Sequence, residues 1–214
     1  MATKTAKTSN EESLLGVVIP PIATQMITVK IVGDSPLIEH KWSEKAKKQI
    51  LDKQTKKATA GKEAKDPWMD FCESLYWLTP MPEYPTMEDI ANARFGFPAT
   101  AFKTAAIDAG YQQGYLAKKT TARGAFFIEG EMVEIIGTPT IREDMVKIGM
   151  GVADIRYRGE FKEWSAVLTI KYNPSVMSAD QIINLINLGG FSNGVGEWRM
   201  SKDGMFGCFH IAAC

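Results

Sequence analysis

The alternation of apolar and polar residues predicts three strands that frame the chain. Residues 26–32 read MITVKIV, residues 164–172 read WSAVLTIKY, and residues 205–212 read MFGCFHIA. β-Branched and aromatic residues that alternate with polar ones suit a strand with one buried face. Weaker patterns predict short strands at 124–128, 132–136 and 194–199, with a hairpin turn at Gly130 joining the first two.

Helical spacing of apolar residues predicts three helices between these strands. Asp66 and Pro67 suit the N-cap and first position of a helix that the proline-rich residues 79–85 end, before a connecting loop. Its apolar face would carry Trp68, Phe71, Cys72, Leu75 and Leu78. Residues 99–113 predict a helix with a small-residue face. A capping box of Ser178 and Gln181 opens the last helix, 181–188, which Gly189 and Gly190 should end in a left-handed cap.

The order of these elements predicts an α+β fold. Strand, helix, strand, strand, followed by the same series again, is a split βαβ pattern of the ferredoxin-like kind. Two insertions interrupt it, a large one at about 41–95 and irregular strands or a protruding hairpin at 137–160. We therefore expect one domain over 26–214.

Residues 1–25 form a polar arm that ends in the apolar LLGVVIPPI. This stretch is too short and too broken by proline to be an export signal or a membrane span. We expect it to dock on the rest of the fold or on a neighbouring copy, or else to be a disordered tail.

Composition and motifs limit the classes of function that the sequence supports. Lysine plus arginine equals aspartate plus glutamate at 25 each, so any basic surface must be local. Cys72, Cys208 and Cys214 are odd in number and lack metal-site spacing, which suits a cytoplasmic protein. The sequence has no P-loop, HExxH or GxSxG motif, so we predict no metal, no cofactor and no conventional enzyme.

Basic residues gather in three places. Residues 41–65 hold nine lysines and three acids, and the 118–123 stretch holds three basic residues with no acid before Glu129. Cations at such density suit the phosphates of a nucleic acid, with a solvated surface as the alternative. The candidates are Lys41, Lys45, Lys48, Lys56, Lys57, Lys103, Lys118, Lys119 and Arg123, with Arg142, Arg156 and Arg158 in the predicted hairpin.

The most informative stretch is the glycine-rich segment, residues 189–207, which reads GGFSNGVGEWRMSKDGMFG. Gly194, Gly196, Gly204 and Gly207 bracket Trp198, Arg199 and Lys202. Glycine permits close backbone approach, an indole can stack on a base, and cations can meet phosphates. In a strand Trp198 and Arg199 would face opposite ways, so Trp198 could equally be a core residue.

These residues carry a resemblance to a known family. GVGEWRMSKDGMFG resembles the glycine-rich loop of the RAMP superfamily, the RNA-binding proteins of CRISPR complexes, although its spacer is longer. Residues 97–103 (FPATAFK) are similar to a helix-starting element of the backbone subunits, with Pro98 and Lys103 matching and the glycines missing. The turn Gly33-Asp34-Ser35-Pro36 looks like the one after their first strand.

The resemblance implies an RNA-recognition-like palm with finger-like and thumb-like insertions. It also implies that copies assemble head to tail along a single nucleic-acid strand. The expected location is the cytoplasm of a bacterial host cell, and the expected source of such a relative is a phage or prophage genome. We expect a non-catalytic protein that binds single-stranded RNA or DNA, with RNA favoured, as a homo-oligomer. One alternative is an interaction module that mimics or caps a CRISPR backbone. Another is an endoribonuclease that uses His40 or a metal-dependent Asp34, while His210 is structural.

Overall fold

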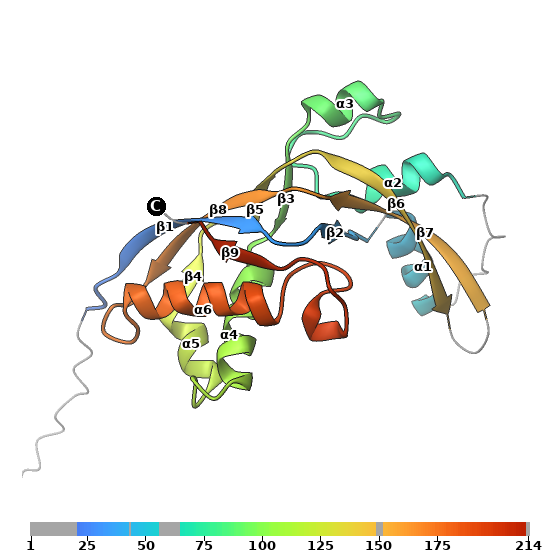
Figure 1. Ribbon diagram of the computed structural model, residues 1–214. Coiled ribbons are helices and arrows are strands. Elements are labelled where there is room, and N and C mark those ends of the chain that lie inside the picture. The colour runs from blue at the N-terminus through green and yellow to red at the C-terminus, as the bar shows by residue number, and fades with distance from the viewer. Residues whose placement is uncertain (1–20, 43, 56–64, 149–151, 213–214) are drawn as a thin grey trace, which may run out of the picture.

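The computed structural model describes residues 21–42, 44–55, 65–148 and 152–212. One antiparallel sheet forms its main body, and the strands of this sheet are β1 (Gln25–Gly33), β3 (Phe95–Pro98), β4 (Phe126–Ile128), β5 (Met132–Ile136), β8 (Ser165–Tyr172) and β9 (Phe209–Ile211). The order is β3-β5-β8-β1-β9, and β4 also pairs with β8. Three helices lie on one face of the sheet (Figure 1): α4 (Ala99–Gln112), α5 (Lys119–Ala125) and α6 (Ala179–Ser192).

Alternation along the two central strands builds the core. In β1, Val29 and Ile31 are buried and stand opposite Leu168 and Ala166 of β8. Their side chains share the helix-covered face because strand residues two apart point the same way. Helices α4 and α6 pack closely: a Cβ on Gly189 would lie 2.6 Å from the Ala106 amide nitrogen. Only glycine at this position of α6 lets the helices approach so near.

A second sheet extends from this body. It consists of β2 (Leu37–Glu39), β7 (Val152–Phe161) and β6 (Pro139–Ile148) in that order. Strands β6 and β7 form an antiparallel hairpin at the opposite end of the molecule from the start of β1 (Figure 1). Helix α2 (Pro67–Ser74) packs on the hairpin, where Leu75 occupies the space that a side chain on Gly159 would need. The remaining helices are α1 (Glu44–Gln54), α3 (Met87–Asn92) and the 3-10 turn η1 (Met200–Lys202).

Several sequence expectations are confirmed. The mixture of helices with antiparallel sheets is an α+β fold. Asp66 caps α2 by accepting hydrogen bonds from the Trp68 and Met69 amides, and Ser178 and Gln181 form the predicted capping box of α6. A separate finding concerns membranes: among the described residues, no helix has the length and apolar character needed to cross a bilayer. Most of the predicted arm, residues 1–20, lies outside the described residues.

The predicted hairpin at 124–136 is wrong. Residues 119–125 form α5, and both β4 and β5 pair with β8 instead of with each other. The Gly130 turn exists, with φ of +82°, but β8 is long enough to hold β4 at Ile170–Tyr172 and β5 at Ser165–Ala166. Burial of Ala122 and Ala125 on the side of α4 stabilises the short helix that the sequence pattern missed.

Three helix boundaries also differ from the sequence expectation. Helix α6 continues through Gly189 and Gly190, and its left-handed end is Gly194, with φ of +65°. Helix α2 stops at Ser74, so Leu78 is exposed instead of extending the apolar face. A capping box of Thr86 and Asp89 opens α3 where the sequence suggested only a loop.

Candidate nucleic-acid interface

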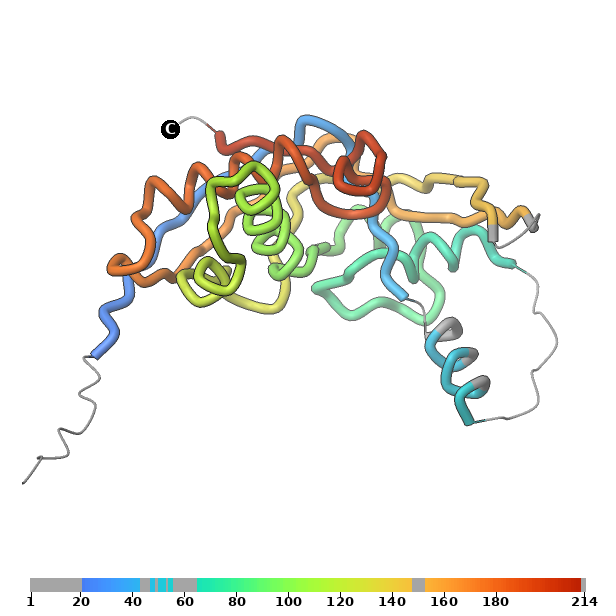
Figure 2. The backbone as a smooth tube through the Cα atoms, turned by 90° about the horizontal axis from the view of Figure 1, so that it is seen from below, coloured from blue at the N-terminus to red at the C-terminus, as the bar shows by residue number. Residues whose placement is uncertain are grey.

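The main hollow of interest is a cleft of about 220 Å³. Most of its lining comes from three parts of the chain, β2 with the residue after it, helix α4, and the segment that follows α6, and Tyr76 and Phe97 complete it. Its lining residues are Ile38, His40, Tyr76, Phe97, Ala101, Thr104, Ala105, Asp108, Asn193, Gly194, Val195, Gly196, Glu197, Arg199 and Ser201. Figure 2 shows the segment after α6 in red, crossing the blue stretch that holds β2.

The glycine-rich segment is not a strand, which corrects the prediction for 194–199. The backbone turns at Gly194 and Gly196, and Trp198 has a left-handed φ of 52°. The segment bonds to β2 instead, because Glu197 donates its amide to the Ile38 carbonyl at 3.0 Å. Asn193, which is buried, donates its side-chain amide to the Ala105 carbonyl of α4 at 3.1 Å. The loop is thus fixed to both neighbours.

The glycines serve the packing of this segment against itself. A Cβ on Gly204 would overlap the Trp198 carbonyl, and one on Gly207 would overlap the Val195 carbonyl. The Val195 amide donates to the Gly207 carbonyl at 2.9 Å, so two stretches of the loop backbone are in contact with no side chain between them. The sequence left open whether the glycines admit a ligand or another stretch of backbone, and at Gly204 and Gly207 they admit backbone of the same segment.

This close packing leaves the three bracketed side chains on the outside. Trp198 is 42% exposed, so the alternative of a core tryptophan is wrong. Arg199 lines the cleft, where its guanidinium donates to the Gly196 carbonyl at 2.9 Å and to the Ser201 hydroxyl at 3.1 Å. Lys202 is exposed at the end of η1. An exposed indole beside two cations is the combination that single-stranded nucleic acids require.

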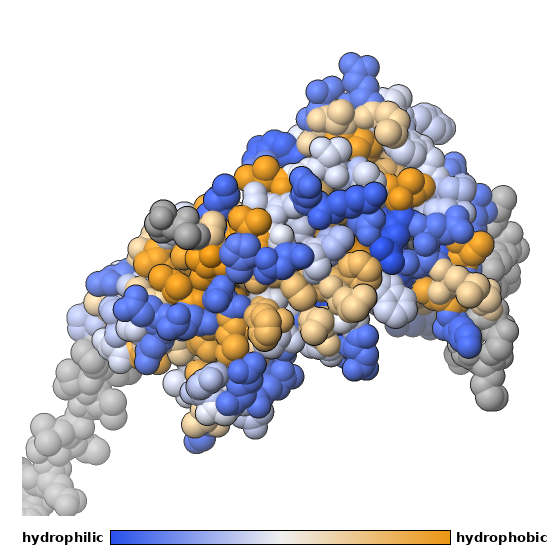
Figure 3. Space-filling view, viewed as in Figure 1, coloured by the Kyte–Doolittle hydropathy of each residue, from blue (hydrophilic) through white to orange (hydrophobic). Residues whose placement is uncertain are grey.

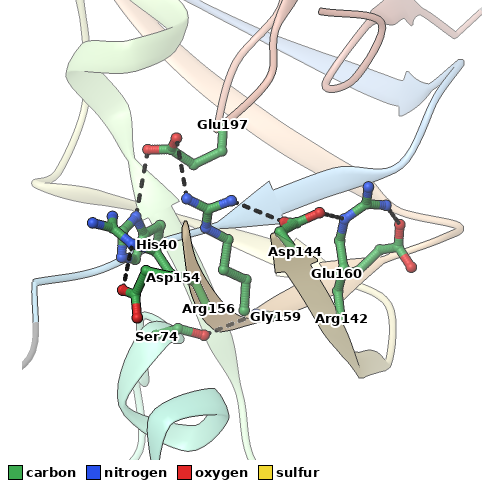
Figure 4. Close-up of polar contacts among 10 residues, drawn as sticks. His40, Ser74, Arg142, Asp144, Asp154, Arg156, Gly159, Glu160 and Glu197 are labelled. Carbon is green, nitrogen blue, oxygen red and sulfur yellow. Dashed lines mark hydrogen bonds and ion pairs between the residues drawn. The ribbon is translucent and has the colours of Figure 1, made fainter. Parts of the chain in front are cut away.

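His40 and Glu197 face each other in the cleft, 3.7 Å apart (Figure 4). The hydrogen bond from His40 lowers the pKa of Glu197, and the charges of Arg158 and Arg199 add to this effect against partial desolvation. Glu39, one residue before His40, is fully buried, and desolvation raises its pKa well above 4.5. Its Oε2 accepts the Tyr76 amide at 3.0 Å, and Oε1 has no partner among the described residues.

The hairpin arginines form an ion-pair ladder (Figure 4). Arg142 bonds to Asp144 at 2.9 Å and to Glu160 at 2.7 Å. Arg158, only 3% exposed, bonds to the second oxygen of Asp144 at 2.8 Å and lies 4.0 Å from Glu197. These cations already have carboxylate partners, so they are poorly placed to neutralise phosphates. Figure 3 shows hydrophilic residues where the hairpin meets the body, as well as over other parts of this face.

The ladder contacts the glycine-rich segment at two points. The Arg142 guanidinium lies over the Phe206 ring, 4.7 Å from its centre, and Arg158 approaches Glu197. Arg156 is more loosely held, 3.8 Å from Asp154. The ladder therefore positions one wall of the cleft.

The basic residues of α4 and α5 divide into engaged and exposed ones. Lys103 donates to the Arg123 carbonyl at 2.8 Å, and desolvation lowers its pKa. Lys119 pairs with Asp108 at 2.8 Å. Lys118 and Arg123 are exposed, and within the described chain neither side chain has an acidic partner. Only these last two match the expected surface for phosphates.

The lysine-rich stretch is described in part. Lys48 is exposed on α1, and Lys41 lines a second hollow of about 330 Å³ together with Trp42 and Trp77. The side chain of Lys45, and all of Lys56 and Lys57, lie outside the described residues.

The two weak catalytic candidates occupy different places. Asp34 and His210 pair with each other, 2.6 Å apart, and both are exposed. Neither lines the cleft, whereas His40 does. No group of three or more potential metal ligands occurs in the described part of the chain.

Sequence reasoning missed Tyr76, Asp108 and Glu197 as cleft residues. Tyr76 and Asp108 lie on elements whose positions depend on the packing of the insertion and of α4, so no local pattern marks them. Glu197 had a signal, because it stands inside the glycine-rich segment between Gly196 and Trp198.

Comparisons with known proteins add little to this picture. No family model matches the chain, and no curated protein matches it. Among solved structures it is similar to the crystal structure of Cmr6 from Pyrococcus furiosus, with 8% sequence identity and a TM-score of 0.43. That likeness covers 90% of this chain and 100% of the other. A score this low carries no conclusion about function.

Proposed function

We propose that this protein binds single-stranded nucleic acid, with RNA favoured, without cleaving it, and that copies assemble side by side along the strand. The observation that carries the proposal is the glycine-rich segment. Its fixed backbone holds Trp198, Arg199 and Lys202 outward beside the cleft. Aromatic stacking with nearby cations binds single strands with little sequence preference.

We further propose that the body is a ferredoxin-like palm of the RAMP kind. The series β1, α4, β4 and β5, β8, α6, β9 repeats a strand-helix-strand pattern twice. The neighbour order β9-β1-β8-β5, with α4 and α6 on one face, supports this assignment. In this reading β6 and β7 are the thumb-like hairpin, and residues 41–95 are the finger-like insertion.

The test is the affinity for a fluorescein-labelled single-stranded RNA, measured by anisotropy at several salt concentrations beside DNA of the same sequence. We expect log K to fall linearly with log salt, by about 0.7 for each phosphate neutralised. Salt-independent binding, or none to either polymer, overturns the proposal. A protein that binds no nucleic acid but captures CRISPR-type proteins would instead be an interaction module.

A matched pair of variants refines this test. Lys118→Ala removes an exposed cation, and Lys119→Ala removes the adjacent lysine, which is paired with Asp108. We expect Lys118→Ala to reduce the salt slope by about 0.7, and Lys119→Ala to change it less. Equal effects would show that the ion pair does not withhold Lys119 from phosphates.

Cleavage is the second candidate function, because His40 lies in the cleft within 3.7 Å of a carboxylate that could orient its ring. Labelled RNA incubated with the wild type, with His40→Ala and with Asp34→Ala, each with and without divalent metal, decides between binding and cleavage. Intact RNA in every lane supports binding alone. Cleavage that His40→Ala abolishes would make the protein an endoribonuclease.

A further inference from the structure

Strand β6 presents an open edge to solvent. It is the outer strand of the order β2-β7-β6, and no described strand pairs with its other side. The edge is ten residues long, and its exposed residues include Ile141 and Met145, at 46% and 74% exposure. A long strand edge with apolar side chains is a site at which another strand can add.

The hydrogen bonds around β7 identify which amides of β6 point outward. Gly159 directs its amide away from β6, to the Ser74 hydroxyl at 2.8 Å, and Ser74 also accepts the amide of Lys41 just after β2. Amides alternate between the two sides of a strand, so Arg158 and its partner Arg142 bond to each other across the hairpin.

The intervening residues of β6 therefore point their N–H and C=O groups to the open side. These residues are Ile141, Glu143, Met145 and Lys147. No backbone hydrogen bond from outside the hairpin reaches them within the described chain.

The chain itself contains a suitable strand. Residues 14–19, which read LLGVVI, are apolar and partly β-branched, and they lie outside the described residues. Six residues in extended form span about 20 Å, enough to bond all four outward positions of β6. Pro20 and Pro21 follow directly, and a proline favours extended backbone in the residue before it.

The segment cannot reach β6 of its own chain. Only residues 20–24 separate it from β1, and five residues span at most about 17 Å. The start of β1 and the hairpin lie at opposite ends of the molecule (Figure 1). A neighbouring copy placed end to end brings its hairpin to that position.

We infer that residues 14–19 of one copy add as a strand to the open edge of β6 in the next copy. The donor and acceptor surfaces differ and lie at opposite ends, so the contact is heterologous and propagates into an array or a ring. The inference rests on the side-by-side assembly of the proposed function and not on its nucleic-acid binding.

Proline substitution tests the edge selectively. Met145→Pro removes an amide that points outward and leaves the hydrogen bonds between β6 and β7 intact, since proline is tolerated on the solvent side of an edge strand. Met145→Ala shortens the same side chain but keeps the amide. In the arm, Val17→Pro with Val18→Pro removes one outward amide whichever register the strand takes, and Val17→Ala with Val18→Ala is its control.

The readout is the mass of nuclease-treated, nucleic-acid-free protein by light scattering over a range of concentrations. We expect the measured mass of wild type and of both alanine variants to increase with protein concentration. Both proline variants should keep the mass of a monomer. A mixture of the two proline variants should form a one-to-one pair and stop, because one keeps its arm and the other keeps its edge. Circular dichroism checks that each variant is folded.

Other outcomes overturn the inference. A wild type that stays monomeric would mean that the arm folds back on its own chain or remains free. If Met145→Pro blocks assembly and the arm variant does not, the β6 edge of one copy pairs with the β6 edge of another and not with the arm. Binding of a short labelled RNA, measured on the same samples, keeps the two proposals separate, because monomeric variants should bind it as wild type does.

Discussion

The hairpin and the glycine-rich segment both carry arginines that the sequence marks as candidates for phosphates, yet the two regions use them differently. In the hairpin, Arg142 and Arg158 bond to carboxylates across the strands. In the glycine-rich segment, the hydrogen bonds of Arg199 within the described chain go to a backbone carbonyl and a hydroxyl, although its charge also acts on Glu197, and Lys202 is exposed. A cation that a carboxylate already holds must break that pair to meet a phosphate, so the partners of an arginine matter more than its presence.

Removing the buried member of the ladder should have the largest effect and should fall on stability. Arg158→Ala leaves Asp144, whose side chain is only 10% exposed, with one partner fewer, and breaking a buried pair costs about 3–5 kcal/mol. Urea unfolding measures the loss. Arg156→Ala, whose partner lies 3.8 Å away on the surface, should cost about 1 kcal/mol or less. Equal costs would mean that the ladder does not depend on burial.

Gly204→Ala should lower the free energy of unfolding by acting on the glycine-rich segment. The new methyl would overlap the Trp198 carbonyl, and we expect a loss of about 3 kcal/mol together with weaker RNA binding. Gly114→Ala is the control, because Gly114 has φ of +79° but open space around it. There only the backbone conformation is penalised, by about 1–2 kcal/mol, and binding should not change. Unchanged binding in a folded Gly204→Ala protein would contradict the role of the fixed loop.

Much of the frame follows from sequence, because local signals decide it. Alternation predicted β1 and β8, and the capping residues Asp66 and Ser178 predicted where two helices begin. What failed depends on tertiary contact. Gly190 lies inside α6, where a side chain would overlap the Phe209 carbonyl, so this glycine serves packing and does not end the helix. No local signal in the sequence reports that distant carbonyl.

The candidate site was predicted only in part, because local composition marks some of its residues and tertiary contacts bring in the others. Trp198, Arg199 and Lys202 stand in one segment, so their composition marked them together. The alternation argument then misplaced them, since positive φ values at Gly196 and Trp198 break any strand there. The pairing of Lys119 with Asp108 joins residues from two helices whose contact the sequence does not reveal.

Trp198→Ala should act on binding and not on stability. Loss of one stacked base costs about 1–3 kcal/mol, or about 5- to 150-fold in affinity, in an RNA anisotropy titration. The thermal midpoint should barely move because the side chain is partly exposed. Phe191→Ala removes an exposed aromatic of α6 and should leave the affinity unchanged. A destabilised Trp198→Ala protein with normal affinity would place the indole in the core instead.

Glu39 offers a smaller effect that depends on pH. Burial raises the pKa of its carboxyl, so between pH 4.5 and that raised pKa the folded state holds a proton that the unfolded state has lost. Stability therefore falls as pH rises through this window, by at most about 1.4 kcal/mol per pH unit. Glu39→Gln keeps the acceptor for the Tyr76 amide and removes the titration, so its advantage over wild type should grow with pH. A constant difference would mean that Glu39 titrates normally.

The most direct test of the account is the salt dependence of RNA binding by wild type and by the triple variant Trp198→Ala, Arg199→Ala, Lys202→Ala. Anisotropy titrations at about 50 and 200 mM salt give both affinity and slope. We predict tight, salt-sensitive binding by wild type, and a folded variant that loses most of its affinity and about 1.4 of its slope, for two missing cations. A variant that binds as wild type does would contradict the assignment of the glycine-rich segment.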